Sequence, residues 1–284
     1  MRTYKALLRT GTQDLREAGI EDAGHEVRRI MMAASGLSRT GLISVEMDEV
    51  PNQVADRFAG MLRKRQARQP LQHILGTTEF YGLELLCDAR ALIPRPDSEV
   101  VVEAALHLIP EGEAMTVADL GTGSGCLLAA ILANRPKVRG IGVEASPEAA
   151  SLARENLSRL GLEDRASVFE GSWADWQDWS SAGLVISNPP YIASAEIASL
   201  SPEVRTHDPM AALDGGDDGL FAYREIIKLA SGNLKPGAWL VFEIGYDQKE
   251  AVSGLLEAAE FSEFGSSKDL GGNDRAVWGR KPEK

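Results

Sequence analysis

The spacing of hydrophobic residues divides the chain into regions with different periodicities. In the first 75 residues, hydrophobic positions recur three and four residues apart, as they do on the buried face of a helix. Asp22 and Pro51 occupy positions that favour helix starts, and a stripe follows each of them: Val27, Ile30, Met31 and Ala34, then Val54, Phe58, Met61 and Leu62. Residues 1–75 are therefore predicted to form a small helical bundle.

Short aromatic and aliphatic runs replace the helical stripes between residues 76 and 92. The runs surround Gly76 and Gly82, a pattern typical of a β-hairpin, and we expect this hairpin to link two domains. Two residues of the next segment, Asp97 and Ser98, are suited to cap a helix over residues 100–108.

From residue 116 onward, hydrophobic runs of strand length alternate with helical patterns. The predicted strands are residues 116–120, 141–143, 166–170, 184–187 and 239–244, and the predicted helices are 126–134, 147–160, 220–233 and 248–259. Such alternation is typical of a mostly parallel sheet with helices on both faces. We therefore predict an α/β domain over residues 93–284, after the helical bundle of 1–75 and the linking hairpin of 76–92.

The fourth predicted strand, Leu184–Ser187, ends abruptly at Asn188-Pro189-Pro190-Tyr191. The prolines have no N–H group, and each also holds the residue before it extended, so the turn exposes carbonyl groups at a strand's carboxyl end. Ligands bind at this edge of open α/β sheets. The Asn188 side-chain oxygen and the Pro189 carbonyl can each accept one N–H of a planar NH2 group, with the Tyr191 ring against its face. The alternative interpretation is an ordinary proline turn.

A glycine-rich turn follows the first strand of the α/β domain. Gly121, Gly123 and Gly125 allow a tight turn and a close approach to a ligand. A dinucleotide fingerprint requires Gly or Ala at position 126, where this chain has Cys126, and the P-loop pattern is missing. The segment 119–125 instead resembles motif I of class I S-adenosylmethionine-dependent methyltransferases. The Asn-Pro-Pro-Tyr turn resembles the signature of methyltransferases that act on glutamine side chains, adenine N6 or cytosine N4.

This resemblance implies a Rossmann-like class I methyltransferase fold and a set of binding positions. Glu144, at the end of the second strand, is expected to bind the ribose hydroxyls of S-adenosylmethionine, and Trp173 to stack on its adenine. Trp173 is alternatively a core residue, because Trp176 and Trp179 follow it. The implied cofactor-binding residues are Gly121, Thr122, Gly123, Ser124, Gly125, Glu144, Trp173 and Asn188. The implied residues for the substrate amide are Asn188, Pro189, Pro190 and Tyr191.

Six segments together resemble the HemK/PrmC family of release factor glutamine N5-methyltransferases: residues 79–83, 92–99, 119–126, 187–192, 213–220 and 242–245. The family methylates the glutamine of the Gly-Gly-Gln motif in class I peptide chain release factors, so such a factor is the implied partner. Arg95 and Glu99 are also candidates for a place near the cofactor pocket, with a role in capping the following helix as the alternative. Two residues depart from the family pattern, Glu144 where Asp is commoner and Ser98 where Thr is commoner.

Composition and charge restrict the alternatives. The 284 residues carry a net charge of −12, whereas proteins that bind duplex DNA normally present a clustered basic face. The one dense basic run, 63–65 with Arg68, is interpreted as a solvated helix face, with partner docking as the alternative. An amino-methyltransferase acting on DNA adenine, or on another Gly-Gly-Gln protein, remains the alternative function. A non-catalytic binding module is disfavoured by the intact glycine loop, Glu144 and Asn188.

Other sequence features predict the compartment and exclude several kinds of site. The longest apolar runs are too short to span a membrane, and the first residues lack the apolar stretch of a signal peptide. Cys87 and Cys126 cannot form a disulfide framework, and no spacing of Cys and His suggests a metal site. We therefore expect a cytoplasmic monomer that uses no metal and binds neither nucleic acid nor membrane.

Overall fold

The computed structural model describes residues 2–283 and divides into two compact units. The first consists of Met1–Gly76 with Pro202–His207, and the second of Thr77–Ser201 with Asp208–Lys284. The predicted division into residues 1–75, 76–92 and 93–284 stays a prediction. The structure groups the hairpin with the second unit and a short distant peptide with the first.

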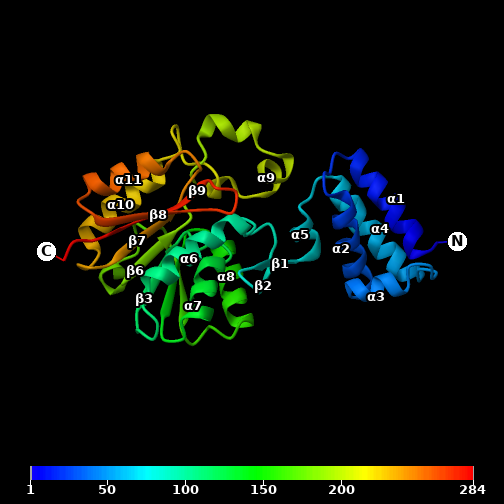
Figure 1. Cartoon of the computed structure of the whole chain (residues 1–284), viewed down its shortest axis with the longest axis horizontal. Coiled ribbons are helices and arrows are strands. Elements are labelled where there is room, and N and C mark those ends of the chain that lie inside the picture. Colours follow the sequence, from blue (N-terminus) through cyan, green and yellow to red (C-terminus); the bar gives the residue numbers. More distant parts are fainter. Residues whose placement is uncertain (1, 284) are drawn as a thin grey trace. The chain divides into compact units, whose positions relative to one another are not determined.

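The first unit is helical (Figure 1). Its helices are α1 (Tyr4–Glu17), α2 (Ala23–Ser35), α3 (Arg39–Ser44), α4 (Asn52–Gln66), α5 (Leu71–Leu75) and α9 (Pro202–His207). Most residues of the two predicted stripes are buried in one hydrophobic core, and Met61 packs at its edge. Asp22 does occupy the position before α2, but its side chain makes no capping hydrogen bond; its carboxylate instead lies 3.3 Å from the His25 ring nitrogen.

The basic run at the end of α4 is only partly a solvated face. Arg63 and Lys64 are exposed, whereas Arg65 is 6% exposed. The Arg65 guanidinium lies 2.5 Å from a Glu26 carboxylate oxygen and 2.9 Å from a Glu203 oxygen. The other Glu203 oxygen accepts a hydrogen bond from Arg68 at 2.8 Å. The solvated-face interpretation was therefore wrong for Arg65, whose carboxylate partners are distant in sequence.

Replacing Arg65 with methionine is expected to lower the free energy of unfolding by about 3 kcal/mol, because Glu26 and Glu203 lose a buried counter-charge. Urea denaturation measures the effect. Arg63→Met, on the exposed side of the same helix, is the matched control and should stay within about 0.5 kcal/mol of the unsubstituted protein. Equal stability of the two variants would contradict a structural role for the Arg65 network.

The second unit is built on a seven-stranded sheet with the order β5-β4-β3-β6-β7-β9-β8. The strands are β3 (Thr116–Leu120), β4 (Arg139–Glu144), β5 (Ala166–Glu170), β6 (Leu184–Ser187), β7 (Trp239–Glu243), β8 (Ser262–Lys268) and β9 (Asp274–Arg280). The first five in this order are parallel, as predicted, whereas β9 is antiparallel to both of its neighbours. The strand pair β8–β9 was missed because its polar and glycine residues hide the alternation.

Helices cover both faces of this sheet (Figure 1). One hydrophobic core lies under α6 (Glu99–Leu108), α7 (Cys126–Asn134) and α8 (Pro147–Arg159). The other lies under α10 (Phe221–Asn233) and α11 (Lys249–Ala258), together with the 3-10 helix η2 (Asp178–Ser181). The hairpin predicted within 76–92 is formed by β1 (Thr77–Phe80) and β2 (Leu83–Leu86).

Three further 3-10 helices precede or follow motif segments: η1 (Pro96–Ser98), η3 (Ser194–Ser199) and η4 (Met210–Ala212). The prediction that the Asp97 or Ser98 side chain caps α6 was wrong. Asp97 lies inside η1, and Ser98 stands at the start of α6 without a side-chain capping bond. A proline at the first position of η1 starts the helical turn earlier than the capping pattern suggested.

Candidate active site

Three parallel strands bring the predicted motifs to one edge of the sheet. Strand β3 lies between β4 and β6, and Leu120 is level with Val143 on one side and with Ser187 on the other. The segments that follow these strands therefore start side by side. They contain the glycine loop, Glu144 and the Asn-Pro-Pro-Tyr turn, which is the arrangement expected for a ligand site in an open α/β sheet.

The glycine loop depends on backbone angles that other residues rarely adopt. Gly121, Gly123 and Gly125 have φ of +69°, +56° and +80°. A side chain at Gly125 would also begin 3.4 Å from the backbone of Ala153 in α8. Gly125 thus lets two helices approach at the back of the loop, whereas the N–H of Gly123 points at the neighbouring strand end and donates to Glu144 at 2.9 Å.

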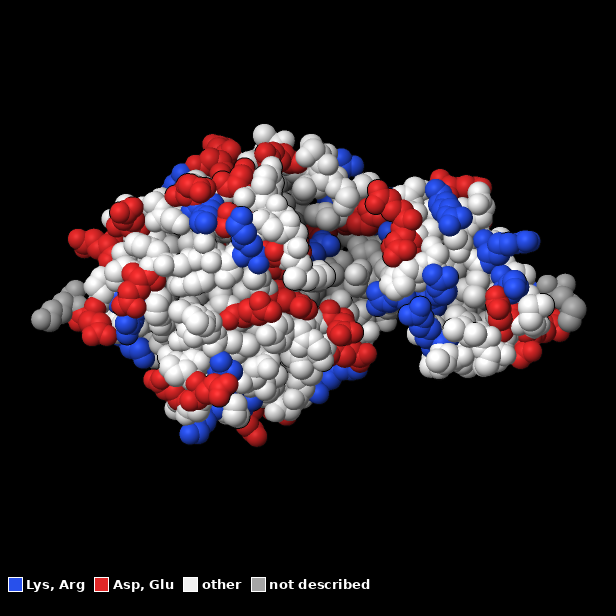
Figure 2. All heavy atoms as spheres, viewed as in Figure 1, with Lys and Arg blue, Asp and Glu red and all other residues white. Residues whose placement is uncertain are grey.

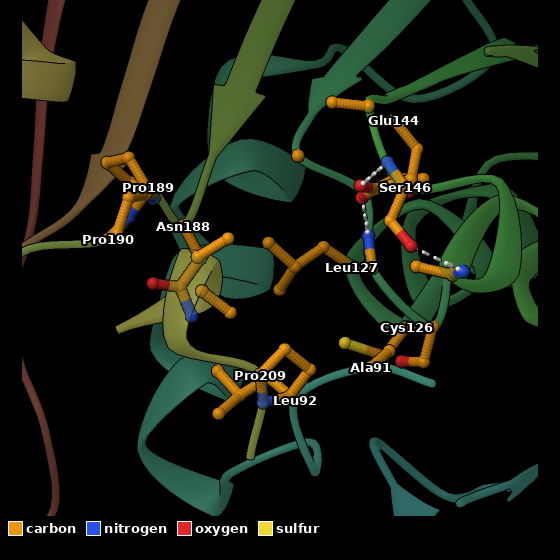
Figure 3. A pocket seen from close by; sticks show the side chains of 18 of the residues that line it. Ala91, Leu92, Cys126, Leu127, Glu144, Ser146, Asn188, Pro189, Pro190 and Pro209 are labelled. Carbon is orange, nitrogen blue, oxygen red and sulfur yellow. Dashed lines mark hydrogen bonds between the residues drawn. The ribbon is translucent and has the colours of Figure 1, made fainter. Parts of the chain in front are cut away.

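The Glu144 carboxylate is held by two backbone N–H groups (Figure 3). Its Oε2 accepts from Gly123 and its Oε1 accepts from Ser146, both at 2.9 Å. Each oxygen of a carboxylate has a second lone pair, so both oxygens can accept a further hydrogen bond from a ligand hydroxyl. The two N–H contacts fix the side chain before any ligand binds, which lowers the entropy cost of binding.

A cavity of about 360 Å³ lies at this edge of the sheet and collects most of the predicted site residues. Figure 3 shows Asn188 and Glu144 on opposite sides of it, with Leu127 between them. The predicted residues that line the cavity are Gly121, Thr122, Gly123, Ser124, Glu144, Trp173, Asn188, Pro189 and Pro190. The predicted residues Gly125 and Tyr191 do not line it: Gly125 packs on α8, and the Tyr191 hydroxyl lies 3.4 Å from Glu243.

The aromatic residues after β5 separate into two roles. Trp173 lines the cavity beside Gly121, where its ring is available to a ligand. Trp176 and Trp179 are each 2% exposed, and their rings pack together in the core with centroids 5.1 Å apart. The core interpretation therefore applies to the second and third tryptophans.

Two walls of the cavity come from segments that were not assigned to the site. One is the stretch from Arg90 to Ser98, and the other includes Pro209 and two alanines of η4. An ion pair joins the walls, with Arg95 Nη2 2.8 Å from Asp208 Oδ2. Arg95 thus lines the cavity, whereas Glu99 accepts a hydrogen bond from the Tyr81 N–H and faces away from it.

Asp119, the first residue of the glycine motif, was also not assigned a role. It is 1% exposed; one oxygen accepts from the Thr122 hydroxyl at 2.6 Å, and the other has no hydrogen-bond partner among residues 2–283. Burial, together with the nearby charge of Glu144, raises the pKa of Asp119 to about 7. Asp119 does not line the cavity, so Glu144 is the carboxyl group that a ligand meets at this end. The sequence could have indicated Asp119, because an acid stands at the start of the glycine motif.

No group of three His, Cys, Asp or Glu side chains within residues 2–283 is arranged to hold a metal ion. No helix in the described part of the chain is long and apolar enough to cross a membrane.

Comparison with known proteins matches both units. The PrmC N-terminal domain model matches residues 6–76, and the methyltransferase small domain model matches residues 99–203. A release factor glutamine methyltransferase of Caulobacter vibrioides is 42% identical over 94% of this chain and 92% of its own length. The chain belongs to the release factor glutamine methyltransferase family. A second member, from Bradyrhizobium diazoefficiens, is 43% identical over 96% of this chain and 93% of its own.

Among solved structures, the hMettl16 catalytic domain has the same fold. It superimposes with a TM-score of 0.57 over 75% of this chain and 81% of its own, at 17% sequence identity. The class I methyltransferase fold predicted for this family member is confirmed, including the mostly parallel sheet and the helices on both faces.

Proposed function

We propose that this chain transfers a methyl group from S-adenosylmethionine to the side-chain amide nitrogen of the glutamine in the Gly-Gly-Gln motif of class I peptide chain release factors. One observation carries the proposal beyond family membership. Asn188 and Pro189 line the same cavity as Glu144, and neither the Asn188 side chain nor the Pro189 carbonyl accepts a hydrogen bond from residues 2–283. Two free acceptors on one rigid turn match the two N–H groups of a primary amide.

The cofactor is S-adenosylmethionine, which supplies a methyl group on a positively charged sulfur. Glu144 would accept hydrogen bonds from the ribose hydroxyls with the oxygens that Gly123 and Ser146 already orient. Trp173 would stack on the adenine ring, and the glycine loop would allow the methionine part to lie against backbone. The Glu144 carboxylate also adds negative charge to the cavity wall, which favours a cationic cofactor.

An amide nitrogen is a poor nucleophile, because its lone pair is delocalised into its carbonyl group. Asn188 and Pro189 would hold the amide NH2 by both hydrogens and fix the nitrogen in one orientation. Positioning of this kind replaces the entropy that the reactants would otherwise lose in reaching the transition state. The same two acceptors become more favourable as positive charge develops on the nitrogen, so they stabilise the transition state more than the ground state.

The distribution of charged residues favours a protein substrate over duplex DNA. Residues 77–284 contain 33 Asp and Glu against 18 Lys and Arg, whereas residues 1–76 contain 9 and 12. Figure 2 shows acidic and basic side chains interspersed over the second unit, whereas Lys and Arg are more frequent on the visible face of the first. An acidic catalytic unit repels a phosphate backbone. We propose accordingly that the chain acts on protein without binding nucleic acid. We also propose, independently of charge, that it acts in the cytoplasm and as a monomer.

The test is transfer of labelled methyl from S-adenosylmethionine to a purified class I release factor, with unmethylated duplex DNA offered in parallel. We expect label on the release factor, and none when the glutamine of its Gly-Gly-Gln motif is replaced by alanine. Label on DNA alone would overturn the proposal in favour of an amino-methyltransferase acting on nucleic acid.

A further inference from the structure

The Tyr191 side chain is turned away from the cavity and toward a buried acid. Its hydroxyl points at Oε1 of Glu243 from 3.4 Å, which is longer than an ordinary hydrogen bond between two oxygens. Glu243 is the last residue of β7 and is 2% exposed. Because Ser187 in β6 is level with Phe242 in β7, Glu243 stands beside the start of the Asn-Pro-Pro-Tyr turn.

Glu243 itself does not line the cavity, but it interacts with a residue that does. Ser98 lines the cavity at the start of α6, and its hydroxyl interacts with the Glu243 carboxyl group. The second carboxyl oxygen, Oε2, is buried and has no hydrogen-bond partner among residues 2–283. A buried carboxyl group with so few partners costs stability, so its presence calls for an explanation other than packing.

The backbone of the same turn is held from another direction. The Gln248 side-chain amide donates to the Tyr191 carbonyl at 2.9 Å, and its oxygen accepts from the Gly245 N–H. A side chain at Gly215 would begin 2.8 Å from the Pro190 carbonyl oxygen, so the 213–220 loop packs directly on the turn. Backbone contacts therefore fix where the turn lies, and the Glu243 contact acts on the one long side chain that the turn carries.

We propose that Glu243 is a positioning residue for methyl transfer: as a carboxylate it accepts the Tyr191 hydroxyl and thereby keeps the Asn188 and Pro189 acceptors in register with the substrate amide. The inference rests on the proposed function, since it assigns the turn to amide binding. This role would explain why three motif segments contact the turn or Glu243 although they line the cavity only in part. The segments are residues 92–99, 213–220 and 242–245.

The surroundings of Glu243 make its charge sensitive to pH. Burial raises the pKa of Glu243 to about 7; the positive charge of Arg275 and the contacts with Ser98 and Tyr191 oppose this shift, and Asp97 adds to it. Tyr223 and Cys126 are the other titratable groups that sense the Glu243 charge. A charged carboxylate accepts the Tyr191 hydroxyl more strongly than a protonated carboxyl group, whose remaining acceptor oxygen is neutral. Activity should therefore rise as pH passes through about 7.

The test compares Glu243→Gln, Tyr191→Phe and the double variant in the full chain. Each is assayed for kcat and KM with a release factor between pH 5.5 and 9, and for S-adenosylmethionine dissociation constant by calorimetry. We expect kcat at pH 8 to fall about 10-fold in each single variant, because each removes the contact between the Tyr191 hydroxyl and the Glu243 carboxylate. The double variant should lose no more than either single, because both changes break one contact. The rise near pH 7 should disappear, and the cofactor dissociation constant should be unchanged.

Glu250→Gln, an exposed residue of α11, is the control and should match the unsubstituted chain throughout. Full activity of Glu243→Gln with an unaltered pH profile would overturn this inference but not the proposed function. So would a double variant whose loss of kcat equals the product of the two single losses. An unsubstituted chain that labels no release factor would overturn the proposed function, and this inference with it. If Glu243→Gln does not fold, Tyr191→Phe decides: an undiminished kcat in that variant contradicts the positioning role.

Discussion

Asn188→Ala is expected to lower kcat for release factor methylation by about 10²–10³-fold, the range found when a preorganised transition-state hydrogen bond is removed. The Asn188 side chain has no hydrogen-bond partner within residues 2–283, so its removal leaves no protein group unsatisfied. The fold should therefore persist. S-adenosylmethionine affinity should change little, because the glycine loop and Glu144 lie across the cavity from this residue (Figure 3). Single-turnover methyl transfer and calorimetric cofactor binding measure the two quantities separately.

Asn188→Asp is the companion variant, since aspartate keeps an acceptor oxygen at the same place. It should retain more activity than Asn188→Ala if accepting an N–H is the role of the side chain. Unchanged turnover in both variants would remove Asn188 from the substrate site.

Glu144→Ala is expected to weaken S-adenosylmethionine binding by about 100-fold. Two hydrogen bonds from ribose hydroxyls to a carboxylate contribute about 3 kcal/mol or more together, and each 1.4 kcal/mol is about tenfold in affinity. The protein itself should lose little stability, because Gly123 and Ser146 are only partly buried and water can replace the Glu144 oxygens.

Calorimetric titration with S-adenosylmethionine tests this expectation. Glu163→Ala, an exposed acid with the same charge change, is the control and should bind the cofactor normally. Glu144→Gln should fall between the two, since it keeps one acceptor oxygen and loses the charge. A dissociation constant that is equal in all three variants would place the ribose elsewhere.

The parts of the fold that the sequence predicted have strong local signals. Strands β3 and β6 are almost entirely buried, so they appear as mostly hydrophobic runs, and glycine or proline follows within two residues of each end. Strand β8 escaped prediction because it lies at the sheet edge and is mostly polar and only partly buried, and its partner β9 contains charged residues and a glycine. An edge strand needs no continuous hydrophobic run, so its pattern resembles a loop.

The functional site likewise combines features that the local sequence predicts with features that depend on distant residues. The glycine loop, Glu144 and Asn188 stand at the carboxyl ends of β3, β4 and β6. Parallel strands place these ends at one edge of the sheet, so the strand pattern was sufficient to predict a common site. The wall that contains Pro209 and the burial of Arg65 depend on segments more than 100 residues away, at Arg95–Asp208 and Arg65–Glu203. No periodicity connects such distant residues.

Tyr191 marks the boundary between what the sequence determined and what the tertiary structure decided. The sequence by itself determined the family, the strand ends and the rigid proline turn, because proline and glycine restrict the backbone locally. Only the tertiary structure decided where the Tyr191 ring points, because that direction depends on Glu243 at the end of a neighbouring strand. Local backbone preferences are encoded within a few residues, whereas the partners of a side chain are set by packing across the whole sheet.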